Sequence, residues 1–409
     1  MSSGRDESAA TADAVVVGGG ILGGWCAWFL SRSGLRHVVL VESDRLGQGS
    51  SSRAAGVVRT QGGTPWTVQL GVWSRDFYRH QRDGLGIDSG FVTQPYFLPC
   101  FTEAEVDATR KRISMEQRLG LDVRWVDPEE ADRLNPTMTP GTTLGGSYCE
   151  TDGFISPPRN VAAYTAALVA AGVDVREGTD FTGLRLVGGR MTGVETSAGF
   201  VATERVVLTG GPKLAAVGRL AGVRIPAGGV RHQIAVTEQD ARFAPDRLPM
   251  VFDVPSGLYW RPEEGGLLFG MSNPDEPPGT VRTIDEPYLA KMRQRLGELV
   301  PSTVGVGLRR VWAATIDFTP DHLPIVGPAT GVDGRIEGVT VAAAGGAGMM
   351  WGPAIARAAA DIALTGTTQV IDDAAALGLD RFDESGHSRL APENVALPFP
   401  SRPERSASA

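Results

Sequence analysis

A glycine-rich turn between two short apolar segments near the N-terminus constrains the fold of this chain more than any other feature. Residues 14–17 are Ala-Val-Val-Val, and they lead into Gly18-Gly19-Gly20-Ile21-Leu22-Gly23, which places glycines at the three positions of a G-x-G-x-x-G motif. An apolar, helix-like stretch follows, and a second apolar run, 38–41, ends at Glu42. This order predicts a strand, a helix and a second, parallel strand that together bind a dinucleotide.

Each glycine of the motif has its own expected role. Gly18 permits a tight turn, Gly20 lets the backbone approach a pyrophosphate, and Gly23 lets the helix pack closely on the strand. The pyrophosphate is expected at the N-terminus of the helix, near Ile21 and Leu22, where backbone N–H groups point at an anion.

The acidic end of the second strand indicates which dinucleotide fits. Glu42, followed by Ser43, is expected at the adenosine ribose, where the carboxylate accepts hydrogen bonds from free hydroxyl groups. A 2′-phosphate would be repelled by this carboxylate, which disfavours NADP. A nicotinamide dehydrogenase using NAD stays open as an alternative at this point.

Size, charge and cysteine content narrow the class of protein. A chain of 409 residues favours two domains. The net charge of −8 argues against nucleic acid or an anionic membrane as a partner. Three widely spaced cysteines suggest neither disulfides nor zinc, and no Asp, Glu or His cluster has metal-ligand spacing, so we predict no metal site. Without an apolar secretion or membrane segment, the chain is predicted to be cytoplasmic.

Between two polar ends the segments alternate in type. We expect disordered tails at 1–12 and 384–409. Helices are predicted at 67–83, 103–119, 160–171, 288–299 and 353–364, and strands at 173–176, 181–187, 191–196, 200–203, 205–211, 230–237, within 250–272, and at 339–344.

Several separated stretches resemble the FAD-dependent amine and amino-acid oxidase superfamily, which includes sarcosine oxidases, glycine oxidase and D-amino-acid dehydrogenases. The resemblance rests on the unit 18–42, the serine loop and following residues 50–59, Val-Val-Leu-Thr-Gly-Gly-Pro at 206–212, Thr-Pro-Asp-His-Leu-Pro-Ile-Val-Gly-Pro at 319–328, and Gly-Gly-Ala-Gly at 345–348. Singly, each stretch is a common turn; in this order they are specific.

The resemblance implies an α/β fold with a Rossmann-like FAD-binding domain of the glutathione-reductase type and an interleaved substrate domain built on an antiparallel sheet. The expected FAD-binding segments are 13–91, 152–222 and 317–372, and the expected substrate-domain segments are 92–151 and 223–316. Besides the residues already named, the cofactor contacts implied for this chain are Ser50, Ser51, Ser52, Val175, Gly210, Gly211, Gly346, Ala347, Gly348 and Met349.

The substrate contacts are also taken from the resemblance. Sarcosine oxidases carry an arginine after the serine loop that pairs with the substrate carboxylate, and Arg59 stands at that position. Tyr259 and Arg261 alternate with Trp260 on a predicted strand, so the first two share a face that we expect to cover the flavin. Met350, where the sarcosine oxidases add a lysine, is expected to line the substrate side.

The chain also departs from the family pattern. Leu268 replaces the lysine that favours oxygen reduction, Ala314 replaces a cysteine that tethers flavin in some members, and Ser52 and Arg53 occupy the place of a histidine tether. The implied cofactor is therefore non-covalent FAD, and the electron acceptor is either oxygen or a carrier.

The predicted activity is oxidation of a C–N bond in an amino acid or N-substituted amine. Hydride transfer to flavin N5 would leave an imine. Two alternatives are a flavin subunit that needs a partner polypeptide and an enzyme that oxidises 2-hydroxy acids.

Overall fold

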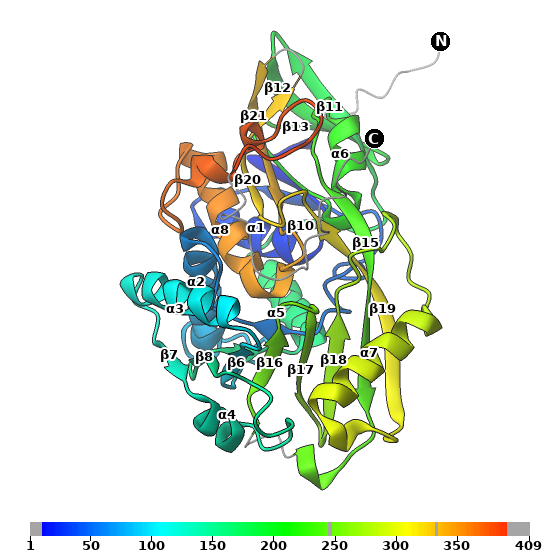
Figure 1. Cartoon of the computed structure of the whole chain (residues 1–409). Coiled ribbons are helices and arrows are strands. Elements are labelled where there is room, and N and C mark those ends of the chain that lie inside the picture. Colours follow the sequence, from blue (N-terminus) through cyan, green and yellow to red (C-terminus); the bar gives the residue numbers. More distant parts are fainter. Residues whose placement is uncertain (1–9, 244–247, 332–333, 391–409) are drawn as a thin grey trace, which may run out of the picture.

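The computed structural model describes residues 10–243, 248–331 and 334–390. Two large sheets and one small sheet organise the chain (Figure 1), with the ten-stranded sheet in the upper half of this view and the eight-stranded sheet in the lower half. Both sheets draw on segments that are far apart in the sequence, so the chain passes repeatedly between them.

The ten-stranded sheet has the order β1-β13-β12-β21-β14-β2-β3-β10, with β11 on β12 and β20 on β21. Its strands are β1 (Ala10–Thr11), β2 (Ala14–Val17), β3 (Val38–Val41), β10 (Asp174–Arg176), β11 (Phe181–Val187), β12 (Arg190–Thr196), β13 (Gly199–Ala202), β14 (Val206–Thr209), β20 (Ile325–Gly331) and β21 (Gly334–Ala343). β2 pairs in parallel with both β3 and β14, and β14 pairs in parallel with β21.

The eight-stranded sheet has the order β19-β15-β18-β17-β16-β6-β8-β7, and a three-stranded sheet has the order β4-β9-β5. The larger sheet contains β6 (Tyr96–Pro99), β7 (Val123–Val126), β8 (Gly146–Cys149), β15 (Gly228–Thr237), β16 (Met250–Asp253), β17 (Leu258–Glu263), β18 (Gly266–Met271) and β19 (Leu308–Phe318). The small one contains β4 (Val57–Val58), β5 (Val92–Thr93) and β9 (Gly153–Phe154).

Eight α-helices accompany these sheets in the described part of the chain. They are α1 (Ile21–Arg32), α2 (Pro65–His80), α3 (Glu103–Arg118), α4 (Pro128–Leu134), α5 (Pro157–Ala170), α6 (Leu214–Leu220), α7 (Glu286–Leu299) and α8 (Gly348–Thr365). A π-helical turn, η1 (Gln81–Leu85), continues α2, and short 3₁₀ turns are η2 (Gly211–Lys213), η3 (Ala241–Phe243), η4 (Pro301–Thr303), η5 (Ala374–Leu377) and η6 (Leu379–Arg381).

The parallel strands read as continuous apolar runs because both of their faces are covered. All four residues of β2, β3 and β14 are buried. On one face, Val16 and Leu40 pack with helices α1 and α8; on the other, Val15 and Val39 pack in a separate cluster with Leu214 of α6. The dinucleotide-binding turn therefore lies between a rigid sheet and a buried helix.

Helix α7 covers the lower sheet (Figure 1), where Leu289, Met292 and Leu296 pack against Trp260 and Phe269. The opposite face of this sheet is left to line a cavity. The small sheet has a different role, since β4 ends directly before Arg59 and fixes the backbone that presents it.

The expected tails need correction where the structure describes them. Ala10 and Thr11, which were expected in a disordered tail, form β1 and pair in parallel with β13. Near the other end, Phe382 pairs with Ser388, and Leu390 packs against the core of the upper sheet. Backbone pairing and apolar packing therefore order these segments, although the sequence around them is polar. Residues 1–9 and 391–409 lie outside the described residues.

A buried ion pair ties the C-terminal segment to the Thr-Pro-Asp motif. Arg381 Nε donates to Asp321 Oδ2 at 2.8 Å, and Nη2 donates to Oδ1 at 3.1 Å, with both side chains 4% exposed. The same guanidinium also donates to the carbonyl oxygens of Leu323 and Leu377. The Thr-Pro-Asp motif is therefore held in place by Arg381, which lies beyond the stretches that resemble the family.

We expect Arg381→Ala to lower the free energy of unfolding by about 3–5 kcal/mol, because it leaves a buried carboxylate without its partner. Urea unfolding of the purified protein measures the change. Arg389→Ala, which removes an exposed arginine of the same segment, is the control and should be close to neutral. A neutral Arg381→Ala would contradict the structural role of this pair.

Candidate active site

One elongated cavity of about 760 Å³ runs between the two sheets. The dinucleotide-binding turn, the serine loop, the 210–212 turn and the N-terminus of α8 all line it. It is also lined by Arg59, which directly follows β4, and by Tyr96, His232, Phe252 and Tyr259 of the lower sheet.

The backbone of the glycine turn has no room for side chains at two positions. Gly18 has φ +100°, and a Cβ atom there would lie 2.7 Å from the carbonyl oxygen of Thr209. A Cβ on Gly23 would lie 1.7 Å from the carbonyl oxygen of Gly18. Gly20 has no such backbone neighbour and lines the cavity, as a position approached by a pyrophosphate requires.

Glu42 is held in place by the same turn. Its Oε2 accepts from the N–H of Gly19 at 2.6 Å, and its Oε1 accepts from the N–H of Asp44 at 2.8 Å. The carboxylate lines the cavity together with Ser43. A carboxylate has about four acceptor positions, so two bonds to the backbone leave capacity for ribose hydroxyl groups.

The serine loop closes over the N-terminus of α1. Ser51 Oγ accepts from the N–H of Ile21 at 2.9 Å, which satisfies one of the free donors at the helix start. Ser50 Oγ donates to the carbonyl oxygen of Thr315 on β19. Through these two hydrogen bonds the serine loop connects α1 with β19 of the lower sheet.

The last glycine loop is braced by a buried carboxylate that the sequence analysis did not identify. Asp317 Oδ2 accepts from the N–H groups of Ala344 at 2.8 Å and Gly345 at 3.0 Å. Burial raises the pKa of Asp317, and these N–H groups oppose that shift. From the other side, the Tyr78 hydroxyl donates to the carbonyl oxygen of Met349 at 3.0 Å.

The structure brings most of the predicted site residues to this one cavity. Those that line it are Gly18, Gly20, Ile21, Leu22, Gly23, Glu42, Ser43, Ser50, Ser51, Arg59, Gly210, Gly211, Tyr259, Gly346, Ala347, Gly348, Met349 and Met350.

Three predicted residues do not line the cavity. The Ser52 N–H donates to the carbonyl oxygen of Gly47, inside the turn of the serine loop. Val175 pairs with Leu40 at the edge of the upper sheet and packs against its core. Arg261 donates from Nε and Nη2 to the carbonyl oxygen of Ala55, so it holds the serine loop from beneath. Strand alternation predicts the face on which a side chain lies, but not how far the side chain extends or which group it contacts.

Among the described residues that line the cavity, Arg59 is the one arginine that is buried, with 2% of the residue exposed. Its guanidinium carbon lies 5.0 Å from the centre of the Phe252 ring and 5.9 Å from that of Tyr96. Burial lowers the pKa of Arg59, whereas Tyr96, Asp152 and Glu116 raise it. A cation held this way is placed to receive an anion from the cavity.

His232 of β15 and Tyr259 of β17 form a stacked pair across the intervening strand β18 of the lower sheet. The Nε2 atom of His232 lies 2.9 Å from the Tyr259 hydroxyl, and the rings are 11° from parallel. Burial lowers the pKa of His232 to about 4, so the imidazole is neutral at physiological pH. The sequence analysis gave a site role to Tyr259 and none to His232.

Tyr96 and Phe252 were missed altogether. Tyr96 lies in β6 and Phe252 in β16. These two short apolar strands pair with each other, and all of their residues are buried. Nothing in such strands distinguishes a cavity-lining ring from a core ring.

Two negative results concern only the described residues. Within 10–243, 248–331 and 334–390, no group of three or more His, Cys, Asp or Glu side chains is placed to hold a metal ion. In the same ranges, no helix combines the length and apolar character needed to cross a bilayer.

The parallel sheet, and the glycine turn that lines the cavity at the start of α1, are typical of dinucleotide-binding proteins. Residues 13–362 match the family described as FAD dependent oxidoreductase, and the chain belongs to this family.

Known proteins that are similar to this chain agree with this assignment. The chain is 29% identical to 4-methylaminobutanoate oxidase (formaldehyde-forming) of Paenarthrobacter nicotinovorans, over 91% of this chain and 46% of that protein. It is 30% identical to glycine oxidase of Pseudomonas putida, over 78% of this chain and 86% of that protein. The crystal structure of L-proline dehydrogenase from P. horikoshii has the same fold, with a TM-score of 0.82 and 23% identity over 90% of this chain and 97% of that one.

The relatives differ in length from this chain. It spans less than half of 4-methylaminobutanoate oxidase, whereas it spans most of glycine oxidase.

Gly23→Ala is expected to abolish retention of FAD, because the new Cβ would overlap the Gly18 carbonyl oxygen and separate α1 from the turn. Absorbance of the purified protein near the flavin bands measures cofactor content. Gly49→Ala is the matched control, since Gly49 lines the same cavity and an added Cβ meets no atom within 4 Å. Full flavin content in Gly23→Ala would contradict the binding of FAD by this glycine turn.

The pKa of His232 also predicts how stability depends on pH. Because the folded value, about 4, lies below the ordinary value of about 6.5, the unfolded chain binds this proton first as pH falls. The free energy of unfolding should therefore decrease between about pH 6.5 and 4 by more in the wild type than in His232→Gln. Urea titrations at several pH values test this, and parallel curves for the two proteins would refute it.

Proposed function

We propose that this chain oxidises a C–N bond of an amine that also carries a carboxylate, using FAD. The observation that carries this proposal is the buried guanidinium of Arg59 in the wall of the same cavity that the dinucleotide-binding turn lines. An enclosed arginine at one part of a redox cavity selects a substrate with a negative charge.

Binding of the carboxylate is favoured by the surroundings of Arg59. A guanidinium can hold a carboxylate through two parallel charge-assisted hydrogen bonds, and its planar shape matches the two oxygens. The rings of Phe252 and Tyr96 beside it restrict the guanidinium and exclude water from its faces. Because these rings exclude water, an ion pair between Arg59 and a substrate carboxylate would be stronger here than in water.

The Tyr259–His232 pair is suited to orient the amine. With the neutral imidazole accepting at Nε2, the Tyr259 hydroxyl donates to His232, and its oxygen is left to accept a hydrogen bond from the substrate nitrogen. Arg59 and Tyr259 would then hold the two polar ends of the substrate, which fixes the direction of the C–H bond between them.

The residues that line the cavity fit FAD. Gly20 leaves space beside the start of α1 for a pyrophosphate, and Glu42 faces the cavity with acceptor capacity for a ribose. When bound, FAD supplies the hydride acceptor, N5 of its isoalloxazine ring. The backbone near Gly346 to Met349, at the N-terminus of α8, would favour negative charge on the adjoining ring.

The residues at the tethering positions support non-covalent binding of FAD. Ala314 lines the cavity and has no nucleophile, and Arg53 donates to carbonyl oxygens of its own loop, at Gln48 and Gly49. Cys26, Cys100 and Cys149 are all buried and none lines this cavity. Denaturation should therefore release the flavin into solution.

The similar proteins support the substrate class. The names 4-methylaminobutanoate oxidase and glycine oxidase both describe substrates that carry an amine and a carboxylate. Arg59 and Tyr259 would meet these two groups in a related substrate here.

A second candidate is a flavin subunit whose turnover depends on a partner polypeptide. The buried Leu268, which packs with Ile234 and Val236 beside the cavity, leaves no cation there to assist oxygen and agrees with transfer of electrons to a carrier.

An anaerobic screen of the flavin-loaded protein tests both candidates. We expect an amino acid or N-methyl amino acid to bleach the flavin absorbance, and readmitted air then shows whether oxygen restores it. Bleaching only by 2-hydroxy acids would replace C–N with C–O oxidation. A yellow protein that no substrate reduces until another polypeptide is added would establish the subunit, and a colourless protein that binds NAD would contradict FAD itself.

Arg59→Ala should raise KM for the carboxylated substrate about 30-fold or more while FAD is retained, because losing one partner of a buried charge pair costs about 2–5 kcal/mol. Steady-state kinetics measure the change. Arg118→Ala, an exposed arginine on α3, is the control variant, and an amine without a carboxylate is the control substrate. An unchanged KM in Arg59→Ala would remove the carboxylate site.

A further inference from the structure

Behind Arg59, away from the cavity, lies a cluster of buried charges that the proposed reaction does not use. It consists of Arg59, Arg112 and Glu116 of α3, and Asp152; we call it the Arg59 cluster. Glu116 and Asp152 are 0% exposed, and Arg59 is 2% exposed. The Arg112 side chain is 11% exposed, so two cations and two carboxylates lie together with little access to solvent.

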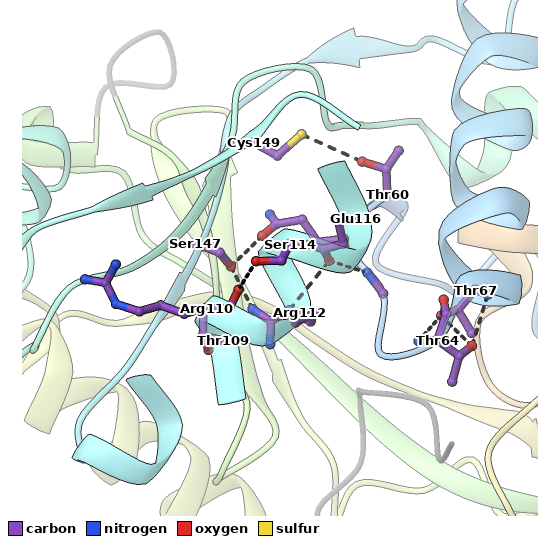
Figure 2. A network of polar contacts seen from close by, with 12 residues as sticks. Thr60, Thr64, Thr67, Thr109, Arg110, Arg112, Ser114, Glu116, Ser147 and Cys149 are labelled. Atoms are coloured by element: carbon purple, nitrogen blue, oxygen red, sulfur yellow. Dashed lines mark hydrogen bonds and ion pairs between the residues drawn. The ribbon is translucent and has the colours of Figure 1, made fainter. Parts of the chain in front are cut away.

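The two carboxylates hold the backbone that follows Arg59. Asp152 Oδ1 accepts from the N–H of Thr60 at 2.8 Å, and Glu116 Oε1 accepts from the N–H of Gly62 at 2.9 Å. Figure 2 shows Glu116 and Arg112 on α3 pointing toward this segment, with Arg112 linked to it through Ser147. A change of charge in the cluster thus acts on the segment that presents Arg59.

The ionised form of Glu116 is stabilised by fewer hydrogen bonds than that of Asp152. Asp152 accepts from the amide N–H and hydroxyl of Thr60 and from Gln61 Nε2, so both of its oxygens have donors. Glu116 Oε2 has no hydrogen-bond partner among the described residues, and the ion pair with Arg112 Nε, at 3.5 Å, falls on the other oxygen. An ionised oxygen buried without a donor is costly.

We infer that Glu116 takes up a proton from solvent when a substrate carboxylate binds Arg59, so that the buried charge behind the cavity stays balanced. The inference rests on the proposed carboxylate site at Arg59. A third carboxylate would leave two cations facing three anions in a region of low dielectric constant. Formation of one O–H bond at Glu116 removes that excess negative charge.

The titration behaviour of the cluster agrees with this assignment. Burial raises the pKa of Glu116 to about 7, against the opposing effects of Arg112, the Gly62 N–H and Arg59, and with a further contribution from Asp152. Burial also raises the pKa of Asp152, and the hydrogen bonds from Thr60 and Gln61 oppose that shift.

The other titratable groups near the cluster do not take up this proton. Burial raises the pKa of Cys149 to about 12 and also raises that of Tyr96, so both stay neutral and protonated. Arg79, whose guanidinium donates to the carbonyl oxygen of Thr151, adds positive charge near Asp152 and favours its ionised form.

Binding of acetate to the flavin-loaded protein tests the inference, because acetate has no amine to titrate. Perturbation of the flavin spectrum gives Kd between pH 6 and 9, and calorimetry in buffers of different ionisation enthalpy counts protons. We expect proton uptake and a Kd that rises with pH, about tenfold for each unit by which acetate raises the pKa of Glu116. Glu116→Gln should bind acetate with neither effect.

Two further variants keep the inference testable. Asp107→Asn, an exposed change on the same helix, should behave as the wild type. Arg112→Gln removes the cation beside Glu116 and should move the pH dependence to higher pH, which gives a result even if Glu116→Gln does not fold. Binding without proton uptake, or uptake that persists in Glu116→Gln, would overturn the coupling alone. Failure of the wild type to bind acetate at any pH would overturn the carboxylate site as well.

Discussion

The burial of the Arg59 guanidinium is the constraint on which the proposed substrate site depends. A cation enclosed by Tyr96 and Phe252 persists only if anions and hydrogen bonds compensate for lost water, and Asp152 and Glu116 supply the anions. These carboxylates come from segments distant in the sequence, and each holds the backbone just after Arg59. The position of α3, the small sheet that ends at Arg59 and the polarity of the cavity wall are therefore linked.

The cofactor side rests on a different principle, which is close approach of backbone. Gly18 and Gly23 pack so tightly on neighbouring carbonyl oxygens that no side chain fits, and Asp317 fixes the N–H groups of the last glycine loop. Such contacts position peptide groups instead of side chains, so a large cofactor can be held by residues with little chemistry of their own. The two sides meet in one cavity, which is why we assign binding and oxidation to a single site.

The sequence predicted the features that local rules determine. The strand–turn–helix–strand unit needs glycine at fixed spacings, and the short apolar runs of β2, β3 and β14 are typical of strands covered on both faces. It could not predict features made by distant pairs. Arg381 is one arginine among many until it meets Asp321, and Glu116 reads as an ordinary acid of an amphipathic helix until α3 packs beside Gly62. Arg261 shows the same limit, since alternation gives the face of a side chain and not its partner.

The most direct test of the account is a crystal structure of the flavin-loaded protein with bound acetate. The account predicts one continuous cavity in which the pyrophosphate of FAD lies at the start of α1 and the acetate oxygens lie within hydrogen-bond distance of the Arg59 guanidinium. Acetate bound elsewhere, with the Arg59 side chain covered by protein or by the flavin, would contradict the claim that cofactor and substrate carboxylate share this site.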